Sequence, residues 1–494
     1  MSVHVGWLLR QNASRRGASV ALTTMRGNAT YAELDERASR LAARLSRHDV
    51  LPGDRVLLCA GNDPAYVAAY FAILYAGATV VPVPVVSAPA EVAFRARHAK
   101  TRVAFVDAAR RDLVPEGVLA LDPHDEDDAA TLEPRDAPAT DVGGGLAMIL
   151  YTSGTTGTPK GAMITHASLV AHTGALVHHV LRLEEDDVVL GALPLTHSFG
   201  IRMTVLAPFY AGARTVLVDR FDAPLTLALA EREGVSWLPG VPTMFDAWGH
   251  TKGMPLAWLR WCLSAGAPLP AETRRRAEKR LGAEVREGYG LTEATFTTID
   301  APPDFRTEGS VGRPVWGVEV TLRKEHDEDE VGEVLVRGQN VMVGYLDDPE
   351  ATREAFADGW LRTGDLGRLE DGRLVLVDRL KDLVLRGGHN VYPSEVEHVL
   401  VEHPAVREAA VVGRPDTHLG EEVVAVLTLH EGATLDLEEL DTCCRARLSK
   451  VKLPREIAIV DAMPLGPSRK ILRRTLRTQV IGGELETRAV PRGS

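Results

Sequence analysis

The chain has 494 residues, which is too long for one hydrophobic core and predicts at least two domains. Hydrophobic residues make up 45% and charged residues 25%, the balance of an ordinary soluble globular protein. The formal net charge of −12 argues against nucleic-acid binding, which needs a broadly basic face. Four scattered cysteines without metal-ligand spacing predict a reduced, cytoplasmic protein without a disulfide framework.

The first part of the chain alternates helix signals with short apolar runs. Thr30 and Glu33 form a capping box before leucines at helical spacing, and residues 55–59 read as a strand. A proline after Asp63 begins the next helix, and residues 79–83 form the next strand. Because glycine and prolines interrupt this uncharged stretch, we expect a helix and a strand here and no integral membrane segment.

Similar strand–helix units recur along the middle of the chain, at residues 102–106, 146–150, 188–190, 213–218 and 235–238. This alternation predicts mostly parallel sheets covered by helices. Residues 121–144 are acidic and lack periodicity, which predicts an exposed linker. The arginine run at residues 274–276 falls in a helical pattern and is expected to be a solvated helix face.

The pattern changes after residue 309. Short alternating strands at residues 318–322, 332–337 and 373–377 predict a small β subdomain. From residue 382 onward, helices and strands alternate over about a hundred residues, enough for a separate α+β domain. The predicted fold is therefore α/β, with a large N-terminal domain at 1–380, a small α+β domain at 381–480, and a tail at 481–494 whose final Val-Pro-Arg-Gly-Ser resembles a protease-site remnant.

The segment Tyr-Thr-Ser-Gly-Thr-Thr-Gly-Thr-Pro-Lys-Gly at residues 151–161 carries the clearest functional signal. Glycines let backbone N–H groups turn inward, and the hydroxyls and Lys160 add further donors and a positive charge. Such a loop after a buried strand suits phosphate oxygens, although a solvated polar turn is the alternative. It matches neither the P-loop nor the dinucleotide fingerprint, so the loop by itself indicates phosphate and no particular enzyme.

Five further segments carry chemistry. In Arg-Glu-Gly-Tyr-Gly-Leu-Thr-Glu at residues 286–293, Tyr289 suits a planar base, Thr292 can donate to phosphate, and Glu293 is a hard oxygen ligand for Mg²⁺. Asp365, predicted on a loop, can accept from two ribose hydroxyls. The other three segments are Leu-Pro-Leu-Thr-His-Ser-Phe-Gly at 193–200, the run from Asp378 to Glu397, and the basic run at 463–474.

Together and in this order, these segments resemble the adenylate-forming superfamily of acyl-CoA synthetases, carrier-protein adenylation domains and beetle luciferases. The resemblance covers about residues 25–477. It implies a large N-terminal domain, a small mobile C-terminal domain, and two reaction steps. A carboxylic acid and ATP with Mg²⁺ give acyl-AMP and pyrophosphate, and a thiol then displaces AMP. The thiol is that of CoA or of the phosphopantetheine of a carrier protein.

The resemblance also implies roles for individual residues. Lys470 bridges the carboxylate and the α-phosphate, Thr292 contacts the α-phosphate, and Glu293 binds Mg²⁺. The β- and γ-phosphates are held by Thr152, Ser153, Gly154, Thr155, Thr156, Gly157 and Lys160. Adenine and ribose are held by Gly266, Ala267, Pro268, Glu287, Gly288, Tyr289, Gly290, Asp365 and Arg379. Lys381 is the hinge, the face at Gly387 and Gly388 meets the thiol, and His197 gates the thiol tunnel.

The segment near His197 carries no acidic residue, which favours an acid without an amino group. The candidate pocket is mostly apolar or small and suits a hydrophobic or aromatic acid: His197, Phe199, Met203, Val241, Thr243, Ala265, Gly288, Gly290 and Leu291. Three functions stay open at this point. They are an acyl-CoA synthetase, a stand-alone ligase that loads an acyl carrier protein, and a luciferase-like monooxygenase. Leu385 and Thr196 depart from the family pattern and leave the thiol acceptor undecided.

Overall fold

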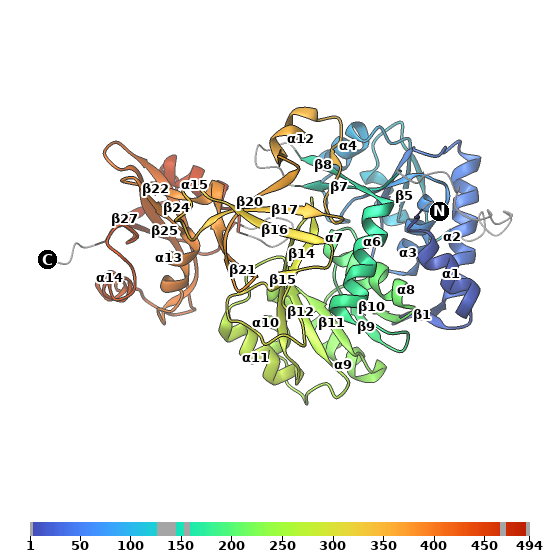
Figure 1. The fold of residues 1–494 in the computed structure, drawn as a ribbon, viewed down its shortest axis with the longest axis horizontal. Helices are drawn as coiled ribbons and strands as arrows, with labels where there is room; N and C mark the ends of the chain where they lie inside the picture. Colours follow the sequence, from blue (N-terminus) through green and yellow to red (C-terminus); the bar gives the residue numbers. More distant parts are fainter. Residues whose placement is uncertain (1–2, 126–144, 153–158, 465–470, 491–494) are drawn as a thin grey trace. The chain divides into compact units, whose positions relative to one another are not determined.

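A computed structural model describes residues 3–125, 145–152, 159–464 and 471–490 (Figure 1). The chain forms two compact units. The large unit comprises Met1–Thr321, Leu335–Arg362 and Gly372–Leu374, and the small unit comprises Leu322–Val334, Thr363–Asp371 and Val375–Ser494. This mixed α/β architecture, with a large N-terminal part and a small C-terminal part, confirms the predicted fold class.

A nine-stranded sheet forms one half of the large unit, in the order β15-β14-β13-β12-β11-β9-β10-β1-β2. The strands are β1 Val20–Thr24, β2 Gly27–Thr30, β9 Val188–Gly191, β10 Arg214–Leu217, β11 Trp237–Gly240, β12 Trp261–Ala265, β13 Val285–Leu291, β14 Thr295–Ile299 and β15 Arg313–Pro314. The central strands run parallel, and both edges turn antiparallel. Helices α9 Ala223–Glu233, α10 Pro242–His250 and α11 Ala271–Leu281 share one apolar core with these strands.

A seven-stranded sheet forms the other half, in the order β18-β8-β7-β4-β3-β5-β6. Its strands are β3 Arg55–Cys59, β4 Thr79–Pro82, β5 Val103–Val106, β6 Leu119–Leu121, β7 Leu146–Thr152, β8 Lys160–Thr165 and β18 Gly344–Tyr345. The first four pair in parallel, whereas β7 with β8 and β8 with β18 are antiparallel. Both sheets therefore have the parallel centres predicted from the alternating pattern.

Two N-terminal helices follow directly from local sequence signals. In α2 Tyr31–Arg47, the Thr30 hydroxyl accepts from the Glu33 N–H at 3.2 Å while Glu33 Oε2 accepts from the Thr30 N–H at 2.8 Å. In α3 Pro64–Tyr75, Asp63 caps the Tyr66 N–H at 3.0 Å, and every residue after the first proline is buried. A helix that is apolar on all sides is typical of a protein interior. Among the described residues, no helix is long and apolar enough to cross a membrane.

Two of the remaining helical elements in the described part of the large unit are π-helical. The complete set there is α1 Trp7–Arg16, α4 Pro89–His98, the 3₁₀ turn Ala108–Leu113, α6 His166–Ala175, the π-segment Leu176–Leu181, α7 Ser198–Ile201, the π-segment Arg202–Leu206, α8 Ala207–Ala211 and α12 Pro349–Ala355. Periodicity cannot reveal such segments, because their apolar spacing differs little from that of an α-helix. They often mark functional sites.

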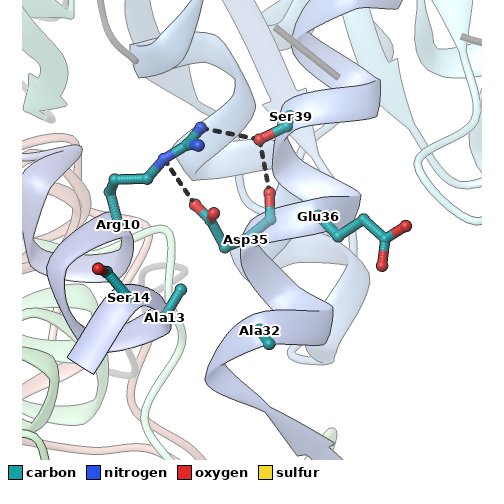
Figure 2. A pocket seen from close by; sticks show the side chains of 7 residues that line it. All are labelled: Arg10, Ala13, Ser14, Ala32, Asp35, Glu36 and Ser39. Carbon is teal, nitrogen blue, oxygen red and sulfur yellow. Dashed lines mark hydrogen bonds and ion pairs between the residues drawn. The ribbon is translucent and has the colours of Figure 1, made fainter. Parts of the chain in front are cut away.

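A shallow depression of about 380 Å³ lies between α1 and α2 (Figure 2). Arg10 donates to Ser39 Oγ at 2.9 Å, and its Nε lies 3.2 Å from Asp35 Oδ1. The Tyr75 hydroxyl donates to the same Asp35 oxygen at 2.6 Å. These groups hold α1 and α2 to each other and to α3, and the predicted site residues are not among those that line the depression.

The β subdomain and the small domain make up the rest of the chain. The five-stranded sheet contains β16 Val318–Arg323, β17 Gly332–Gly338, β19 Phe356–Ala357, β20 Trp360–Glu370 and β21 Arg373–Arg379. The six-stranded sheet contains β22 Val384–Arg386, β23 His389–Val391, β24 Val406–Asp416, β25 Gly420–Leu429, β26 Glu456–Ile459 and β27 Thr487–Ala489. The described part of the small unit is completed by a 3₁₀ turn and three helices: Leu380–Asp382, α13 Pro393–Leu400, α14 Leu437–Arg445 and α15 Arg473–Ile481.

The long β24–β25 hairpin explains how the small unit is stabilised. Val411 and Ala425 belong to one apolar cluster, and their neighbours Val412 and Val424 belong to another. Because successive strand residues point to opposite faces, one hairpin supplies both clusters. The six-stranded sheet is therefore covered on both faces.

Three expectations need correction. Of the predicted exposed linker, residues 126–144 lie outside the described part, but Asp122 is buried and its carbonyl accepts from Arg44 at 3.0 Å. Arg274 is also buried, rather than solvated, because it pairs with Glu287 and Glu308. Asp365 lies within strand β20 instead of on a loop. The predicted boundary at residue 381 stays a prediction.

The large unit buries two histidines, His4 and His166, whose protonation we expect to destabilise the folded state in mild acid. The rings of His4 and His166 stack with centroids 3.8 Å apart, and each Nδ1 accepts a backbone N–H. Burial lowers the pKa of His4 to about 4 and that of His166 to about 3. Below their ordinary pKa of 6.5, the unfolded chain binds protons that the folded chain does not, so stability falls as the pH drops from 6.5 toward those values.

We expect the midpoint of thermal unfolding to decrease between about pH 7.5 and about pH 5, with up to ~1.4 kcal/mol lost per histidine per pH unit. In the double variant His4→Asn/His166→Asn, the amide oxygen can replace Nδ1 as acceptor without titrating. This variant should show a smaller decrease than the parent. A decrease of equal size in both proteins would show that other groups carry the pH dependence.

Candidate active site

The two ends of the predicted phosphate loop lie beside each other. Thr152 ends β7 and Lys160 begins β8, and the antiparallel pairing places them opposite each other. The Thr152 hydroxyl donates to the Lys160 carbonyl at 3.5 Å. The predicted residues Ser153, Gly154, Thr155, Thr156 and Gly157 lie outside the described residues. The strand pairing therefore fixes where the loop leaves and re-enters the sheet.

One tyrosine connects Lys160 with Glu293. The Tyr345 hydroxyl donates to Glu293 Oε1 at 2.8 Å, and Lys160 Nζ lies 5.3 Å from the centroid of the Tyr345 ring. Burial, together with the Glu293 charge, raises the pKa of Tyr345 well above its ordinary value. Tyr345 is in turn placed by β18, where it pairs with Ala162 next to the loop. A cation and a carboxylate far apart in sequence thus contact the same tyrosine, the lysine over its ring and the carboxylate at its hydroxyl.

The turn that carries Thr292 and Glu293 has a tight backbone. It joins β13 to β14, and Thr295 adopts a left-handed φ of 45°. A Cβ at Gly290 would lie 1.8 Å from the Thr295 carbonyl oxygen, so only glycine fits there. The Glu293 carbonyl also accepts from the Met342 N–H at 2.7 Å. These constraints hold the Glu293 side chain in place against the segment that contains Tyr345.

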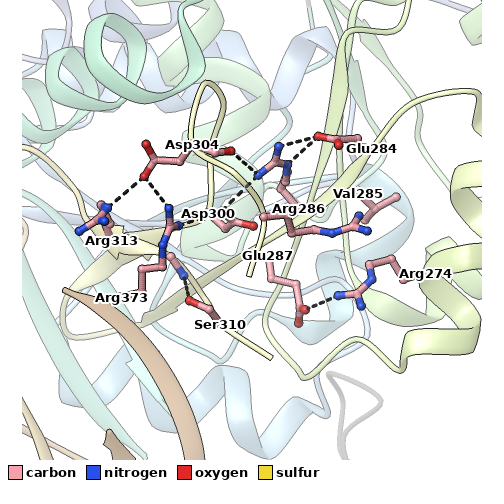
Figure 3. Close-up of polar contacts among 12 residues, drawn as sticks. Arg274, Glu284, Val285, Arg286, Glu287, Asp300, Asp304, Ser310, Arg313 and Arg373 are labelled. Atoms are coloured by element: carbon pink, nitrogen blue, oxygen red, sulfur yellow. Dashed lines mark hydrogen bonds and ion pairs between the residues drawn. The ribbon is translucent and has the colours of Figure 1, made fainter. Parts of the chain in front are cut away.

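The Glu287 carboxylate contacts one backbone N–H and one arginine side chain within the large unit (Figure 3). It accepts from the Leu269 N–H at 3.1 Å and lies 3.5 Å from Arg274. Burial raises the pKa of Glu287, against the opposing effects of Leu269 and Arg274. Because Leu269 directly follows the predicted adenine-contact residues Gly266, Ala267 and Pro268, the Glu287 carboxylate anchors that segment.

A second network lies on the other side of the same strand (Figure 3). Arg286 donates to Asp300 at 3.3 Å and to the Asp304 carbonyl at 3.1 Å. Arg373 donates to the Asp304 carboxylate at 3.0 Å. Arg286 thus holds the segment after β14 against β13, and Arg373, the first residue of β21, holds the same segment against β21. The strand that carries Glu287, Gly288, Tyr289 and Gly290 is therefore braced by charged groups at its start.

Asn62, which precedes α3, and Tyr66 in its first turn fix the segment that carries His197. Asn62 accepts from the Leu195 N–H at 3.0 Å and donates to the Leu193 carbonyl at 2.8 Å, while the Tyr66 hydroxyl donates to the Leu195 carbonyl at 3.2 Å. A Cβ at Gly200 would lie 1.9 Å from the Pro194 carbonyl oxygen, so the turn into α7 requires glycine. His197 is exposed at the start of α7.

Several predicted pocket residues lie together. Phe199 meets Phe296 edge to face with centroids 5.2 Å apart, and a Cβ at Gly288 would lie 3.1 Å from the Phe296 ring. Gly288 pairs with Ala265, and a Cβ at Gly266 would lie 3.7 Å from Val241. Met203 is fully buried, whereas Thr243 is exposed and Leu291 is half-buried. The structure thus brings Phe199, Val241, Ala265 and Gly288 into one neighbourhood.

The small unit holds another set of predicted residues. Arg379 Nε donates to Asp365 Oδ1 at 2.8 Å, so the two predicted ribose contacts form an ion pair. Lys381 is exposed in the 3₁₀ turn Leu380–Asp382. Gly387 and Gly388, with φ of 58° and 79°, form the two-residue turn between β22 and β23, as the twist of such hairpins requires. Lys470 lies outside the described residues.

Tyr345 is the main site residue that the sequence patterns missed. It lies in a strand of two residues, which has no detectable periodicity. No cluster of three or more His, Cys, Asp or Glu side chains that could hold a metal occurs among the described residues. Glu293 alone can still serve Mg²⁺, because this ion often takes one or two carboxylates and completes its shell with water and phosphate oxygens.

Family models match most of the chain. Residues 9–346 match the AMP-binding enzyme model, and residues 395–470 match the model of the AMP-binding enzyme C-terminal domain. Among curated relatives, a feruloyl-CoA synthase from Amycolatopsis is 38% identical over 472 residues, which cover 91% of this chain and 93% of the relative. A sulfoacetate–CoA ligase from Cupriavidus necator is 38% identical over 428 residues, covering 81% and 82%.

Solved structures agree. ATP-bound MatB from Rhodopseudomonas palustris superposes with a TM-score of 0.91 at 31% identity, covering 97% of this chain and 99% of MatB. The o-succinylbenzoate CoA synthetase MenE from Bacillus subtilis gives a TM-score of 0.87 at 29% identity, covering 98% and 99%. Fold, motif order and relatives define an AMP-forming acid–thiol ligase with acyl-CoA synthetase character. The chain belongs to the AMP-binding enzyme family.

Proposed function

We propose that this enzyme activates a hydrophobic or aromatic carboxylic acid with ATP and Mg²⁺, releases pyrophosphate, and transfers the acyl group to CoA. The feruloyl-CoA synthase and a long-chain-fatty-acid–CoA ligase from Bacillus subtilis, 32% identical over 95% of this chain, support an acid with an apolar body. The apolar character of Phe199, Met203 and Val241 supports the same class. We place the reaction in the cytoplasm, in agreement with four free cysteines.

The contact of Tyr345 with both Lys160 and Glu293 carries this proposal. A carboxylate and a triphosphate repel each other, so adenylation needs positive charge that is already in place. Lys160 at the end of the loop is the proposed contact of the β- and γ-phosphates, with Thr152 beside it. Glu293 is the proposed Mg²⁺ ligand, and Thr292 the proposed donor to the α-phosphate. Tyr345 would keep the lysine and the metal ligand close to each other, where both could serve the phosphates.

The remaining assignments follow the motif order. Tyr289 and the segment of Gly266, Ala267 and Pro268 are the proposed adenine contacts, and Asp365 with Arg379 the proposed ribose contacts. His197 is the proposed gate to the thiol. Lys381 is the proposed hinge of a mobile domain at 381–480, which presents Gly387 and Gly388 in the second step.

Pyrophosphate exchange across a library of acids tests the first step, and thioester formation tests the second. We expect exchange with apolar acids and thioester formation with CoA. If the acyl group is transferred only to the phosphopantetheine of a free carrier protein and not to CoA, the enzyme is a ligase that loads a carrier protein. If no acid supports exchange, the proposed adenylation fails.

Replacing Tyr345 tests the link between the metal ligand and the loop. Tyr345→Phe removes the hydroxyl and keeps the ring under Lys160. We expect a higher KM for Mg²⁺ and pyrophosphate exchange slower by about 10- to 100-fold, because a hydrogen bond to a charged group contributes about 1.5–3 kcal/mol. Tyr345→Leu also removes the ring and should raise the KM for ATP.

Tyr210→Phe is the matched control, since the Tyr210 ring packs against His178 elsewhere in the unit. It should leave both KM values unchanged. A Tyr345→Phe enzyme with the parental Mg²⁺ dependence would show that the hydroxyl does not position Glu293.

A further inference from the structure

Asn62 restrains the backbone on both sides of Pro194. Its side-chain amide donates to the Leu193 carbonyl at 2.8 Å, and its amide oxygen accepts from the Leu195 N–H at 3.0 Å. Because proline has no N–H of its own, these two bonds hold the peptide groups that flank it. One side chain thus binds a short, distant segment at two points.

The peptide at Pro194 in turn sets the backbone of His197. The Pro194 carbonyl accepts from the His197 N–H at 3.2 Å, and the His197 carbonyl accepts from the Ile201 N–H at 3.0 Å in α7. Phe199 has a further support, because its ring meets Phe296 edge to face. A displacement of Pro194 therefore moves His197 more directly than it moves Phe199.

The short loop that carries Asn62 lies at one edge of the seven-stranded sheet. The loop follows β3, while Asp107 follows β5 and His124 follows β6, the next strands in the parallel order. Parallel strands end at the same edge of their sheet, so the three segments meet there. The Asp107 carboxylate accepts from the Gly61 N–H at 3.1 Å, directly before Asn62.

The His124 imidazole contacts two carboxylates at this edge. Its Nε2 lies 3.1 Å from Asp63 Oδ2 and 3.5 Å from Asp107 Oδ1. Contact with Asp107 and Asp63 raises the pKa of His124 to about 10, against the opposing effect of burial, so the ring is a cation at neutral pH. This cation is thus shared by Asp63, directly after Asn62, and by Asp107, which is bonded to the residue directly before it.

Helix α2 holds the segment of His124. The Asp122 carbonyl accepts from Arg44 at 3.0 Å, and the Pro123 carbonyl accepts from Arg37 at 3.1 Å. The Asp122 carboxylate also accepts from the His124 N–H at 2.9 Å. The contacts therefore continue from α2, through His124 and the loop after β3, to the segment before α7, all within the large unit.

We propose that Asn62 is a positioning residue for the thiol-transfer step, which places His197 through Leu193 and Leu195, and that His124 keeps Asn62 in place. This inference rests on the proposed function, in which His197 is the gate to the thiol, and adds the residues that act through it. Their effect reaches the reaction through the backbone of His197. It therefore falls on thioester formation and not on adenylation.

Asn62→Ala tests the proposal on the full chain. Pyrophosphate exchange measures adenylation, and thioester release from the synthetic acyl-AMP of an acid that supports exchange measures thiol transfer over a titration of CoA. We expect parental exchange and a kcat/KM for CoA lower by up to about 10²-fold, since a misplacement of about 1 Å can cost this much. Asn62→Asp keeps the acceptor for the Leu195 N–H, so it should show a smaller loss, and it replaces Asn62→Ala if that variant does not fold.

His124→Gln tests the next residue of the network. The glutamine amide can donate to one carboxylate but carries no charge, so Asp63 and Asp107 lose the cation that they share. We expect the same pattern as in Asn62→Ala, parental exchange and slower thioester formation, with a smaller loss. Parental thioester formation in this variant would overturn the role of His124 and leave that of Asn62 standing.

A double-mutant cycle shows whether Asn62 acts through His197. In the His197→Ala background, Asn62→Ala should lower the kcat/KM for CoA little further, because the effects of coupled residues do not add. Asn12→Ala is the matched control, since the Asn12 amide also donates to two backbone carbonyls, those of Leu8 and Phe209. It should lower the thermal midpoint and leave the ratio of the two half-reaction rates unchanged.

The outcomes are distinct. Equal loss of both half-reactions in Asn62→Ala assigns Asn62 a purely structural role and overturns the proposal. Parental thioester formation in that variant, or a loss that keeps its full size in the His197→Ala background, overturns it as well. If His197→Ala itself forms thioester at the parental rate, the gate assignment fails together with this inference, while adenylation stands. Absence of exchange with every acid overturns the proposed function itself.

Discussion

Lys470→Ala is expected to slow acyl-AMP formation by about 10²–10³-fold, the cost of losing one preorganised contact to developing charge. Lys470 is the lysine of the basic run at 463–474, and we propose that it bridges the carboxylate and the α-phosphate in the first step. Because the proposed domain rotation removes it before the second step, thioester formation from supplied acyl-AMP should keep its parental rate. Pyrophosphate exchange measures the first rate, and thioester release from synthetic acyl-AMP measures the second.

Lys450→Ala is the matched control, because Lys450 is exposed in the same unit and no motif includes it. Both rates should be unchanged in this control. Equal loss of both half-reactions in Lys470→Ala would show that the lysine serves the fold of the small unit rather than adenylation.

Glu293→Gln is expected to reduce pyrophosphate exchange by about 10²-fold or more, and excess Mg²⁺ should restore only part of it. The amide oxygen of glutamine can still accept from the Tyr345 hydroxyl, so the local geometry is kept while the charge is lost. Metal ions stabilise the charge that develops on a transferring phosphoryl group by several kcal/mol, and a neutral amide is a poor ligand for Mg²⁺. Exchange rates over a Mg²⁺ titration measure the effect.

Glu354→Gln, on the exposed side of α12, is the corresponding control and should titrate like the parent. If Glu293→Gln also titrates like the parent at every Mg²⁺ concentration, the metal ligand lies elsewhere.

Local signals predicted the elements well where a few neighbouring residues decide the structure. The Thr30–Glu33 capping box and the Asp63 cap are both present, because each involves atoms three residues apart. The parallel centres of the two sheets followed from the alternation of apolar runs with helices. Asp222 caps α9 in the same local way, accepting from the Leu225 N–H at 2.9 Å.

Contacts between distant segments set the limit of prediction. Arg274 looked solvated because its helix is strongly basic, and only folding brings Glu287 and Glu308 to it. Tyr345 gains its role from Glu293, 52 residues earlier, and from the sheet position of Lys160. The motif order supplied the candidate residues, but not the side chains that connect them.

The carboxylate of Asp378 has a consequence for the proposed rotation at Lys381. One oxygen accepts from the Arg379 N–H and the other from the Ser394 N–H at the start of α13, both at 2.7 Å. Arg379 precedes Lys381 in the chain and Ser394 follows it. A rotation at Lys381 therefore breaks the hydrogen bond between the Ser394 N–H and Asp378 unless α13 moves together with Asp378. A hydrogen bond to a charged group contributes about 1.5–3 kcal/mol. Breaking it would add an energy barrier to the domain rotation between the two half-reactions and would leave the two chemical steps themselves unchanged.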